Sequence, residues 1–234
     1  MTHQTAVSGS FMPRRPPARE VAARCVPNAA GSVLDRFGAR IVVARNRAVI
    51  EEGDPADHVF KVVAGALRMV RVLPDGRRHL SDFLMPDAYF GMTDTDAYTH
   101  SVEAVSDATL LRYPRHKFEA MLNSNASMSR HFLGVVSGQL AATQQRLLLL
   151  GRMTATERLA TFLLGMADRK TGTGPEVELP MNRGDIADYL GLTVETVSRG
   201  LTQLRSRRII DLPTPNHILF LRREALEQIS AGDA

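Results

Sequence analysis

The spacing of apolar side chains divides the chain into segments of different character. From Arg40 to Tyr113, short apolar runs alternate with glycines, prolines and an Asp-Gly pair. This punctuation is typical of short strands joined by turns. Residues 67–73, the turn 74–76 and residues 77–84 predict one hairpin, because Asp-Gly between apolar runs favours a tight reversal. Several runs of this kind predict a small barrel or roll.

Beyond residue 114 the apolar positions take on helical spacing. Residues 115–122 predict a short helix, and residues 126–150 predict a long one of about 24 residues, or roughly 36 Å, which Gly151 is expected to end. Because this length exceeds what a small roll needs, we expect the helix to pair with its own copy in a coiled-coil-like homodimer. The alternative is a helix packed wholly on its own roll. The predicted dimer contacts are Phe132, Val135, Val136, Leu140 and Leu147.

A capping signal opens the C-terminal part of the chain. Thr154 and Glu157 have the spacing of a capping box, in which a hydroxyl and a carboxylate satisfy the first backbone N–H groups of a helix. The helix is predicted to run through Arg169. Its inward positions are Leu159, Phe162, Leu163 and Met166.

Residues 182–205 have the pattern of a helix-turn-helix. Ile186, Ala187 and Leu190 form an apolar seam on the first helix, and Gly191 suits a left-handed turn. Thr193 is a candidate N-cap for the second helix. At 100° per residue, one stripe of that helix is apolar and the opposite arc is polar. The apolar stripe is Val194, Val197, Leu201 and Leu204, and the polar arc is Glu195, Ser198, Arg199 and Thr202.

The polar arc carries groups that suit the edges of DNA bases. Arg199 can donate twice to guanine O6 and N7, Glu195 can accept from cytosine N4, and Ser198 can bond or pack locally. A recognition helix inserts its N-terminal half into the major groove, where these side chains begin. DNA recognition is therefore the first hypothesis. The alternative is an exposed amphipathic helix with solvated charges.

Basic and hydroxyl side chains around this helix are candidates for contacts with the DNA backbone. Arginines and hydroxyl groups bind phosphates and fix the register without selecting a sequence. Residues 209–212, the turn 213–217 and residues 218–221 then predict a two-stranded hairpin, which makes the motif a winged helix. The backbone or supporting candidates are Arg183, Thr193, Thr196, Thr202, Arg205, Arg207 and Arg208.

Length and composition limit the remaining possibilities. A chain of 234 residues with 44% apolar residues can bury two modest cores. It has no apolar run of transmembrane length and no apolar signal core, so we expect no membrane association and a cytoplasmic location. Residues 1–32 are rich in proline and arginine, which predicts a flexible leader. The net charge of +4 is modest, so the DNA hypothesis depends on local clustering.

The order of roll, long helix, capped helix and winged helix resembles the CRP/FNR superfamily of bacterial transcription regulators over residues 33–230. Residues 151–160 and 190–199 carry the resemblance. Glu195, Ser198 and Arg199 match the FNR-like branch, in which the family binds TTGA-type half-sites. The resemblance implies a regulator, in the activator mode, that binds a palindromic operator as a homodimer. It also implies contact with RNA polymerase, for which residues 170–175 are the candidate loop.

The resemblance implies an α+β fold in four parts. Residues 1–32 are the flexible leader, and residues 33–124 form a β-roll of the cyclic-nucleotide-binding, jelly-roll type. Residues 125–151 form the dimerisation helix. Residues 152–234 form the winged-helix domain that binds DNA. The chain is expected not to be an enzyme.

Departures from the family narrow the signal to which the chain can respond. Where nucleotide-binding members have a carboxylate and an arginine, this chain has Met92 and His100, so we expect no response to cyclic AMP. Cys25 is the only cysteine, whereas an iron–sulfur cluster of the FNR type needs four thiolates. The chain therefore resembles the FixK-like subgroup, which lacks the cluster and acts in low-oxygen or nitrogen-oxide circuits. No cofactor and no metal are expected.

Two other functions remain as alternatives. One is a regulator of the same superfamily with a small molecule, or nitric oxide through haem, in its roll. The other is a cupin-like metal enzyme fused to a winged helix. Its metal triad would have to come from scattered histidines, and scattered histidines are more often surface or core residues. The histidines considered are His58, His79, His100, His116 and His131.

Overall fold

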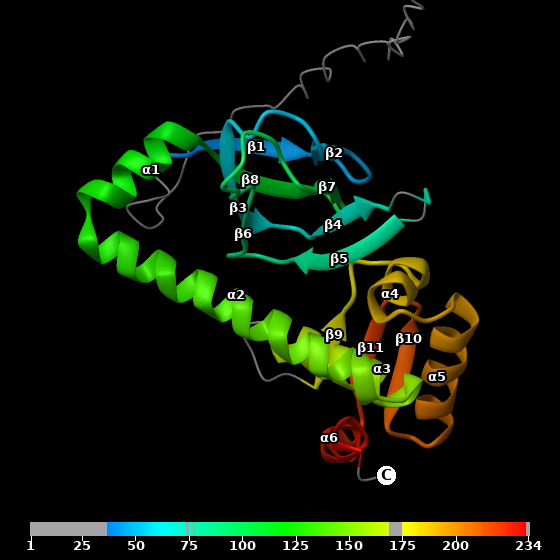
Figure 1. The fold of residues 1–234 in the computed structure, drawn as a ribbon. Coiled ribbons are helices and arrows are strands. Elements are labelled where there is room, and N and C mark those ends of the chain that lie inside the picture. Colours follow the sequence, from blue (N-terminus) through cyan, green and yellow to red (C-terminus); the bar gives the residue numbers. More distant parts are fainter. Residues whose placement is uncertain (1–36, 74, 77, 169–174, 233–234) are drawn as a thin grey trace, which may run out of the picture.

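The computed structural model describes residues 37–73, 75–76, 78–168 and 175–232 (Figure 1). The side chains of residues 145–150 and 152 are also outside this description. The predicted leader, Cys25, residues 170–174 of the candidate polymerase loop and the side chain of Leu147 therefore lie outside the described part. Figure 1 shows a roll above a long helix, with a second domain at the far end of that helix.

Two four-stranded sheets make the roll, with strand orders β1-β8-β3-β6 and β2-β7-β4-β5. Apolar side chains from both sheets fill the space between them, since alternate positions of each strand point inward. The predicted hairpin is present as β4 and β5, which pair antiparallel. The strands are β1 (Ala39–Val43), β2 (Ala48–Ile50), β3 (His58–Ala64), β4 (Leu67–Val72), β5 (Arg78–Leu84), β6 (Tyr89–Phe90), β7 (Ser101–Ala104) and β8 (Ala108–Pro114).

One turn of the roll requires glycine. Gly65 joins β3 to β4 with a φ of +84°, in the left-handed region that disfavours other residues. A Cβ at this position would also lie 2.3 Å from the carbonyl oxygen of Asp107. The glycine therefore lets two chain segments of the roll approach closely.

Two helices follow the roll, α1 (Arg115–Ser124) and α2 (Ala126–Arg152), and α2 continues through Gly151 instead of ending there. The expected end was wrong because a single glycine lowers helix stability without preventing the helical conformation. In Figure 1, α2 runs beneath the roll and leads to the second domain. The predicted long helix is thus present.

The two faces of α2 do not divide as the sequence predicted. Phe132 packs edge-on against Tyr89 and Phe118, with ring centroids 5.6 Å and 5.2 Å away, and Val135 packs on the same cluster. These two predicted dimer contacts thus attach α2 to its own roll. Sequence periodicity missed this because both faces of the helix carry apolar residues. The exposed apolar side chains form an adjoining stripe, the outer face of α2, and are Leu133, Val136 and Leu140.

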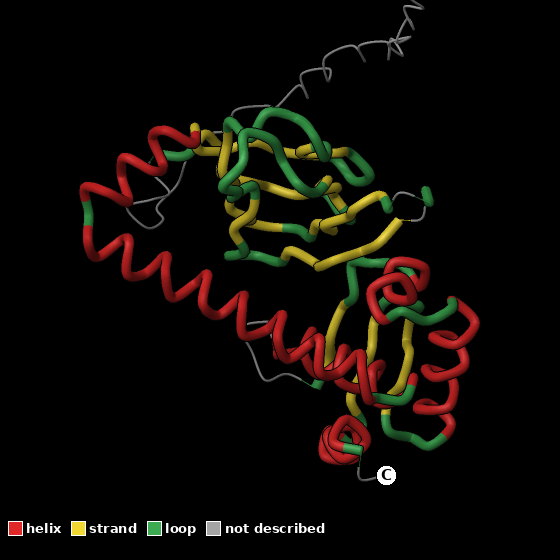
Figure 2. Tube along the Cα trace, in the orientation of Figure 1, coloured by secondary structure: helices red, strands yellow, loops and turns green. Residues whose placement is uncertain are grey.

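The C-terminal domain surrounds one helix with a helix-turn-helix and a small sheet (Figure 2). Its sheet has the order β10-β11-β9, so the predicted hairpin has a third strand that the sequence analysis missed. The Thr154–Glu157 capping box is confirmed, with backbone-to-side-chain distances of 2.9 Å and 3.3 Å. The elements are α3 (Ala155–Asp168), β9 (Glu176–Glu178), α4 (Arg183–Leu190), α5 (Val194–Ser206), β10 (Ile210–Thr214), β11 (His217–Phe220) and α6 (Arg223–Ala231).

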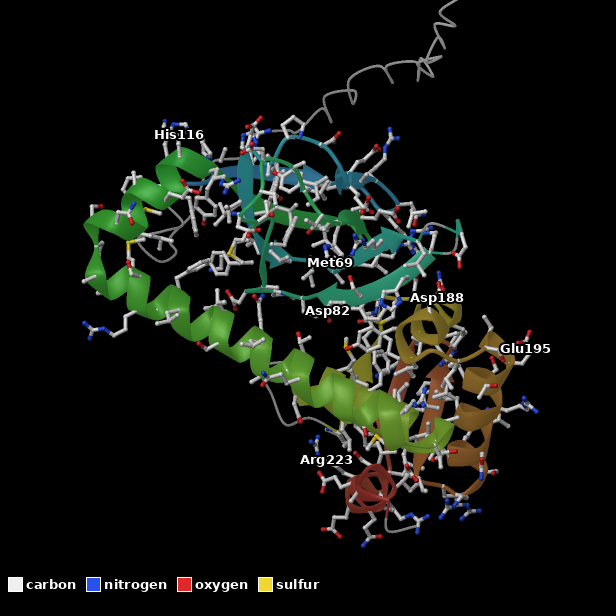
Figure 3. All side chains as sticks on the ribbon, viewed as in Figure 1. Met69, Asp82, His116, Asp188, Glu195 and Arg223 are labelled. Atoms are coloured by element: carbon white, nitrogen blue, oxygen red, sulfur yellow. The ribbon has the colours of Figure 1, made fainter. Side chains whose placement is uncertain are left out.

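Helix α3 is the centre of this domain. Leu159 and Leu163 are almost fully buried, and a Cβ on Gly200 would lie only 2.9 Å from the Leu159 side chain. Helix α5 therefore crosses α3 at close range. On the other side, Arg223 of α6 donates to Asp168 of α3 at 2.6 Å, and Arg223 lies at the base of the domain in Figure 3. Among the described residues, every helix is too short or too polar to span a bilayer.

Candidate nucleic-acid interface

The first helix of the motif, α4, is fixed at both ends. At its start, the side chain of Asn182 accepts from the backbone N–H of Asp185, and Asp185 returns a weaker contact to the Asn182 backbone. At its end, Gly191 adopts the expected left-handed conformation, with φ +63°. Arg158 of α3 donates to the carbonyl of Leu190 at 3.1 Å, which satisfies one of the free carbonyls at that end. The turn into α5 is therefore rigidly defined.

The second helix, α5, has the N-cap that the sequence predicted. The Thr193 hydroxyl accepts from the backbone N–H of Thr196 at 3.2 Å. The inward side chains of Val197, Leu201 and Leu204 are at most 2% exposed. Val194 departs from the predicted packed stripe, because it is the first residue at the helix tip and is 44% exposed. The apolar stripe thus begins one turn later than its sequence period indicates.

The polar arc of α5 is open to solvent along its length. Glu195, Ser198 and Arg199 are all exposed, and in Figure 3 Glu195 lies on the side of α5 that faces away from α2. Within the part of the chain that the structure describes, Ser198 and Arg199 form no side-chain hydrogen bond or ion pair. Two of the predicted reading side chains are therefore uncommitted within the protein.

Glu195 is prepared for an acceptor role at the start of α5. Its pKa is lowered from the usual value by its own backbone N–H and by the Thr193 hydroxyl, with Arg199 contributing a favourable charge. All three favour the ionised carboxylate. Glu195 therefore remains an acceptor at neutral pH, which is the form that a cytosine amino group requires.

The three threonines have local partners. Thr193 and Thr196 share a hydrogen bond between their hydroxyl oxygens at 3.0 Å. Thr202 donates to the carbonyl of Ser198, one turn earlier in the same helix, at 2.9 Å. The hydroxyls of Thr196 and Thr202 retain capacity to accept a further bond. Their first role in this structure is to stabilise α5.

The predicted basic cluster is present at the C-terminal end of α5, and its arginines differ in their contacts. Arg205 forms an exposed ion pair with Asp211 at 3.2 Å. Arg207 and Arg208 are exposed, and Arg208 has a positive φ of 53°. Arg222 donates to the carbonyls of both residues, at 2.6 Å and 3.3 Å, and so holds this turn in place. Sequence analysis did not identify Arg222, because it follows the wing in the sequence and comes close to Arg207 and Arg208 only in the folded structure.

Arg183 is the most constrained of the predicted backbone contacts. One of its guanidinium nitrogens donates to the carbonyl of Pro215 at the tip of the wing, at 2.6 Å. Burial lowers the pKa of the guanidinium, and its Nη1 is buried without a hydrogen-bond partner in the described structure. Arg183 therefore connects α4 to the wing, which is a supporting role.

Comparison with known proteins agrees with this geometry. A Crp-like helix-turn-helix domain matches residues 157–229, and a cyclic nucleotide-binding domain matches residues 40–125. The nitrogen fixation regulation protein FixK of Azorhizobium caulinodans is 38% identical over 203 residues, which cover 85% of this chain and 82% of FixK. The chain belongs to the FixK-like group of the CRP/FNR family.

Two further matches support the assignment of this FixK-like regulator. The structure of FixK2 from Bradyrhizobium japonicum is similar with a TM-score of 0.78 and 35% identity, covering 84% of this chain and 99% of that one. The transcriptional activator protein FnrL of Cereibacter sphaeroides is 33% identical, over 73% of this chain and 72% of FnrL. The predicted family and α+β fold are confirmed. The chain is a DNA-binding transcription regulator and not an enzyme.

The roll of this FixK-like regulator has the nucleotide-binding fold with altered side chains. Met92 is 37% exposed at the position where the resemblance implies a carboxylate. At the arginine position, the His100 imidazole bonds to the Thr99 hydroxyl at 3.0 Å, and burial together with Arg71 lowers its pKa. A neutral imidazole is a poor partner for a phosphate. Among the described residues, no three histidine, cysteine or acidic side chains form a metal-binding group.

Proposed function

We propose that this FixK-like regulator binds a TTGA-type palindrome as a homodimer, with Glu195, Ser198 and Arg199 contacting base edges. The exposed, uncommitted arc of α5 is the observation that carries this proposal. An arginine four residues after a glutamate lies on the same face of the helix, where both side chains enter one major groove. Thr193, Thr196 and Thr202 stabilise that helix and take part in contacts with the DNA backbone.

The remaining arginines supply contacts that do not depend on sequence. Arg207 and Arg208 have exposed side chains beyond the end of α5, and Arg205 has to exchange Asp211 for a phosphate. Arg183 supports the wing that lies beside them. Contacts of this kind supply salt-dependent affinity and fix the protein on the duplex.

The homodimer proposal is supported by the outer face of α2. Leu133, Val136, Leu140, Thr143 and Leu147 follow alternating steps of three and four residues, which is the heptad pattern of a coiled coil. The first three side chains are exposed. A second copy of α2 would cover this stripe and place the α5 helices of the two copies, the reading helices, side by side. Leu133 joins the proposed interface, while Phe132 and Val135 pack on the roll.

A substitution on the outer face of α2 tests the homodimer. Leu140→Lys places a charge in the proposed seam, so we expect monomers in sedimentation experiments and loss of palindrome binding. Ala142→Lys is the matched control, because Ala142 is exposed two positions, or about 200°, further round the helix. Dimers that persist in Leu140→Lys would contradict the proposed interface.

We also propose that DNA binding needs neither cyclic AMP nor an iron–sulfur cluster. Met92 and the neutral His100 support the first part, and the single Cys25 supports the second. The relatives named as nitrogen fixation regulators and FNR-type activators support a place in low-oxygen or nitrogen-oxide responses, in contact with RNA polymerase. Because the proposed partner is chromosomal DNA, we propose that the protein acts in the cytoplasm.

The test uses purified protein in air, without nucleotide or iron. Binding to a TTGA-type palindrome should exceed binding to a scrambled duplex of the same composition at equal salt. Addition of cyclic AMP should leave the ratio unchanged. An absolute requirement for nucleotide, or equal affinity for both duplexes, would contradict the proposal.

A further inference from the structure

The roll and the DNA-binding domain share a packed junction at α4. Phe83 of β5 is 2% exposed, and its ring lies 5.0 Å from Tyr189 of α4 and 6.3 Å from Phe162 of α3. The rings of Tyr189 and Phe162 are themselves 5.6 Å apart. One aromatic side chain of the roll therefore completes the apolar core of the other domain. Figure 1 shows α4 directly beside β5.

An ion pair lies beside this aromatic contact. Arg68 of β4 donates to the Asp185 carboxylate of α4 at 2.6 Å, and the two side chains are 14% and 9% exposed. The other guanidinium nitrogens of Arg68 donate to Glu103 of β7 at 2.9 Å and 2.7 Å. Glu103 also accepts from Arg78 of β5 at 2.8 Å. Arg68 thus joins a charge network of the roll to the helix-turn-helix.

Helix capping alone does not account for this placement of Asp185. Its backbone N–H bonds to Asn182 and its second carboxylate oxygen lies 3.4 Å from the Asn182 backbone nitrogen, but the first oxygen is directed to Arg68. A carboxylate buried to this degree is unfavourable unless it is paired. If the domain swung away from the roll, Asp185 would lose its partner and Phe83 would become exposed. The junction therefore favours one relative position of the domains.

The position of α4 determines the position of α5, because hydrogen bonds fix the turn between them. Arg158 donates to the carbonyl of Leu190, and the backbone N–H of Leu192 donates to the carbonyl of Ala187. The roll is in turn attached to α2 by Phe132 and by Gln139, which donates to the Tyr89 carbonyl. A continuous set of packed contacts thus relates the reading helix to the outer face of α2. Domains without a firm interface move relative to one another.

We propose that Arg68, with Phe83, is a positioning residue that sets the distance between the two reading helices of the dimer, and so the half-site spacing that the protein accepts. This inference rests on the proposed homodimer and palindrome. Two half-sites bind together only when the recognition helices are separated by about one helical turn of DNA, or roughly 34 Å. When the junction is loosened, the distance between the two recognition helices varies over a range. Spacing selectivity then falls, while contact with a single half-site is retained.

The experiment compares full-length variants on three kinds of duplex: the preferred palindrome, palindromes with base pairs added or removed between the half-sites, and a single half-site. Arg68→Met removes the guanidinium, and Asp185→Asn removes the charge while keeping a side chain that can accept from the helix cap. Arg71→Met is the matched control, because Arg71 lies on the same strand but pairs with Glu52 of the roll.

We expect Arg68→Met and Asp185→Asn to lose about two- to thirtyfold in affinity for the preferred spacing, the range found for mutations that alter coupling between sites. They should discriminate less between spacings and bind the single half-site like the parent. Arg71→Met should match the parent throughout. Arg68→Lys, which keeps a charge opposite Asp185, should restore part of the selectivity.

Several results would overturn the proposal. Unchanged spacing selectivity in folded, dimeric Asp185→Asn contradicts it even if Arg68→Met does not fold. An equal loss on the half-site and on the palindrome also contradicts it, because it would indicate damage to the DNA-binding domain itself. A parent protein without preference for any palindrome contradicts the proposed function instead. In that case, faster hydrogen exchange at β5 and α4 in Asp185→Asn still measures whether the junction holds the domains together.

Discussion

The two helices of the helix-turn-helix use their polar residues in opposite ways. On α4, Asp185 is buried, takes part in the capping box and pairs with an arginine of the roll. On α5, Ser198 and Arg199 are exposed and, in the described structure, their side chains form no hydrogen bond within the protein. Both elements are α-helices of one motif, and one tight turn joins them. The difference indicates that α4 holds the position of the motif, whereas α5 is available to contact DNA.

Burial on the inner side of α5 gives the largest expected change in stability. Leu201→Ala removes a side chain that is 2% exposed and leaves a cavity against α3, so unfolding should become easier by about 2–5 kcal/mol. Ser198→Ala, on the exposed arc of the same helix, should change stability by at most about 0.5 kcal/mol. Urea denaturation of both variants measures this. Similar losses in the two variants would show that the outer arc is also structural.

A pair of substitutions on α4 sharpens the comparison at the junction. Asp185→Asn removes the carboxylate charge that pairs with one guanidinium nitrogen of Arg68, while the bonds from Arg68 to Glu103 remain. Weakening a buried hydrogen bond to a charged group costs about 1–3 kcal/mol. Asp188→Asn is the matched control, because Asp188 is an exposed carboxylate on the same helix (Figure 3). Thermal unfolding should show a lower Tm for Asp185→Asn alone. Equal Tm values would mean that the Arg68 pair contributes nothing to stability.

The start of α5 should respond more weakly. Thr193→Ala removes the hydroxyl that accepts from the Thr196 backbone, and the loss of an N-cap costs about 1 kcal/mol. It also removes one of the groups that lower the pKa of Glu195. We expect the Glu195 carboxylate to titrate closer to its usual value in this variant, which NMR titration measures. An unchanged titration would exclude Thr193 as a cause of the shift.

The smallest effect concerns the phosphate contacts. Arg207→Ala should weaken binding to all duplexes alike and reduce the slope of log affinity against log salt by about 1 for each half-site. Arg47→Ala is the control, because Arg47 is an exposed arginine in a turn of the roll. A change in sequence preference with an unchanged salt slope would indicate that Arg207 contacts bases and not phosphates.

Local periodicity was sufficient to predict α5, its cap at Thr193 and the turn at Gly191. Each of these depends on residues within a few positions of one another. The junction could not be found in this way, since Arg68 and Asp185 are 117 positions apart and neither has a local signal. Strand β9 was missed because Glu176–Glu178 is too short to show a period and becomes a strand only by pairing with β11.

The packing of α2 on its own roll could not be predicted for a related reason. A helix that is apolar on two faces has two candidate seams, and the sequence does not say which one the roll covers. Phe132 belongs to the covered seam because Tyr89 and Phe118 lie opposite it. The exposed seam through Leu133 and Leu140 follows only when that contact is known. Contacts between distant segments therefore decide the roles of residues that look equivalent in the sequence.

The central claim, that the outer arc of α5 contacts bases, is tested most directly by a loss-of-contact measurement. The parent and Arg199→Ala are each titrated with palindromes carrying all possible base pairs at every half-site position, at one salt concentration. The parent should prefer G·C at one position by about 1–3 kcal/mol for each half-site. Arg199→Ala should lose this preference at that position only, with all other preferences and the Tm retained. Retained preference for G·C in the variant would contradict the claim.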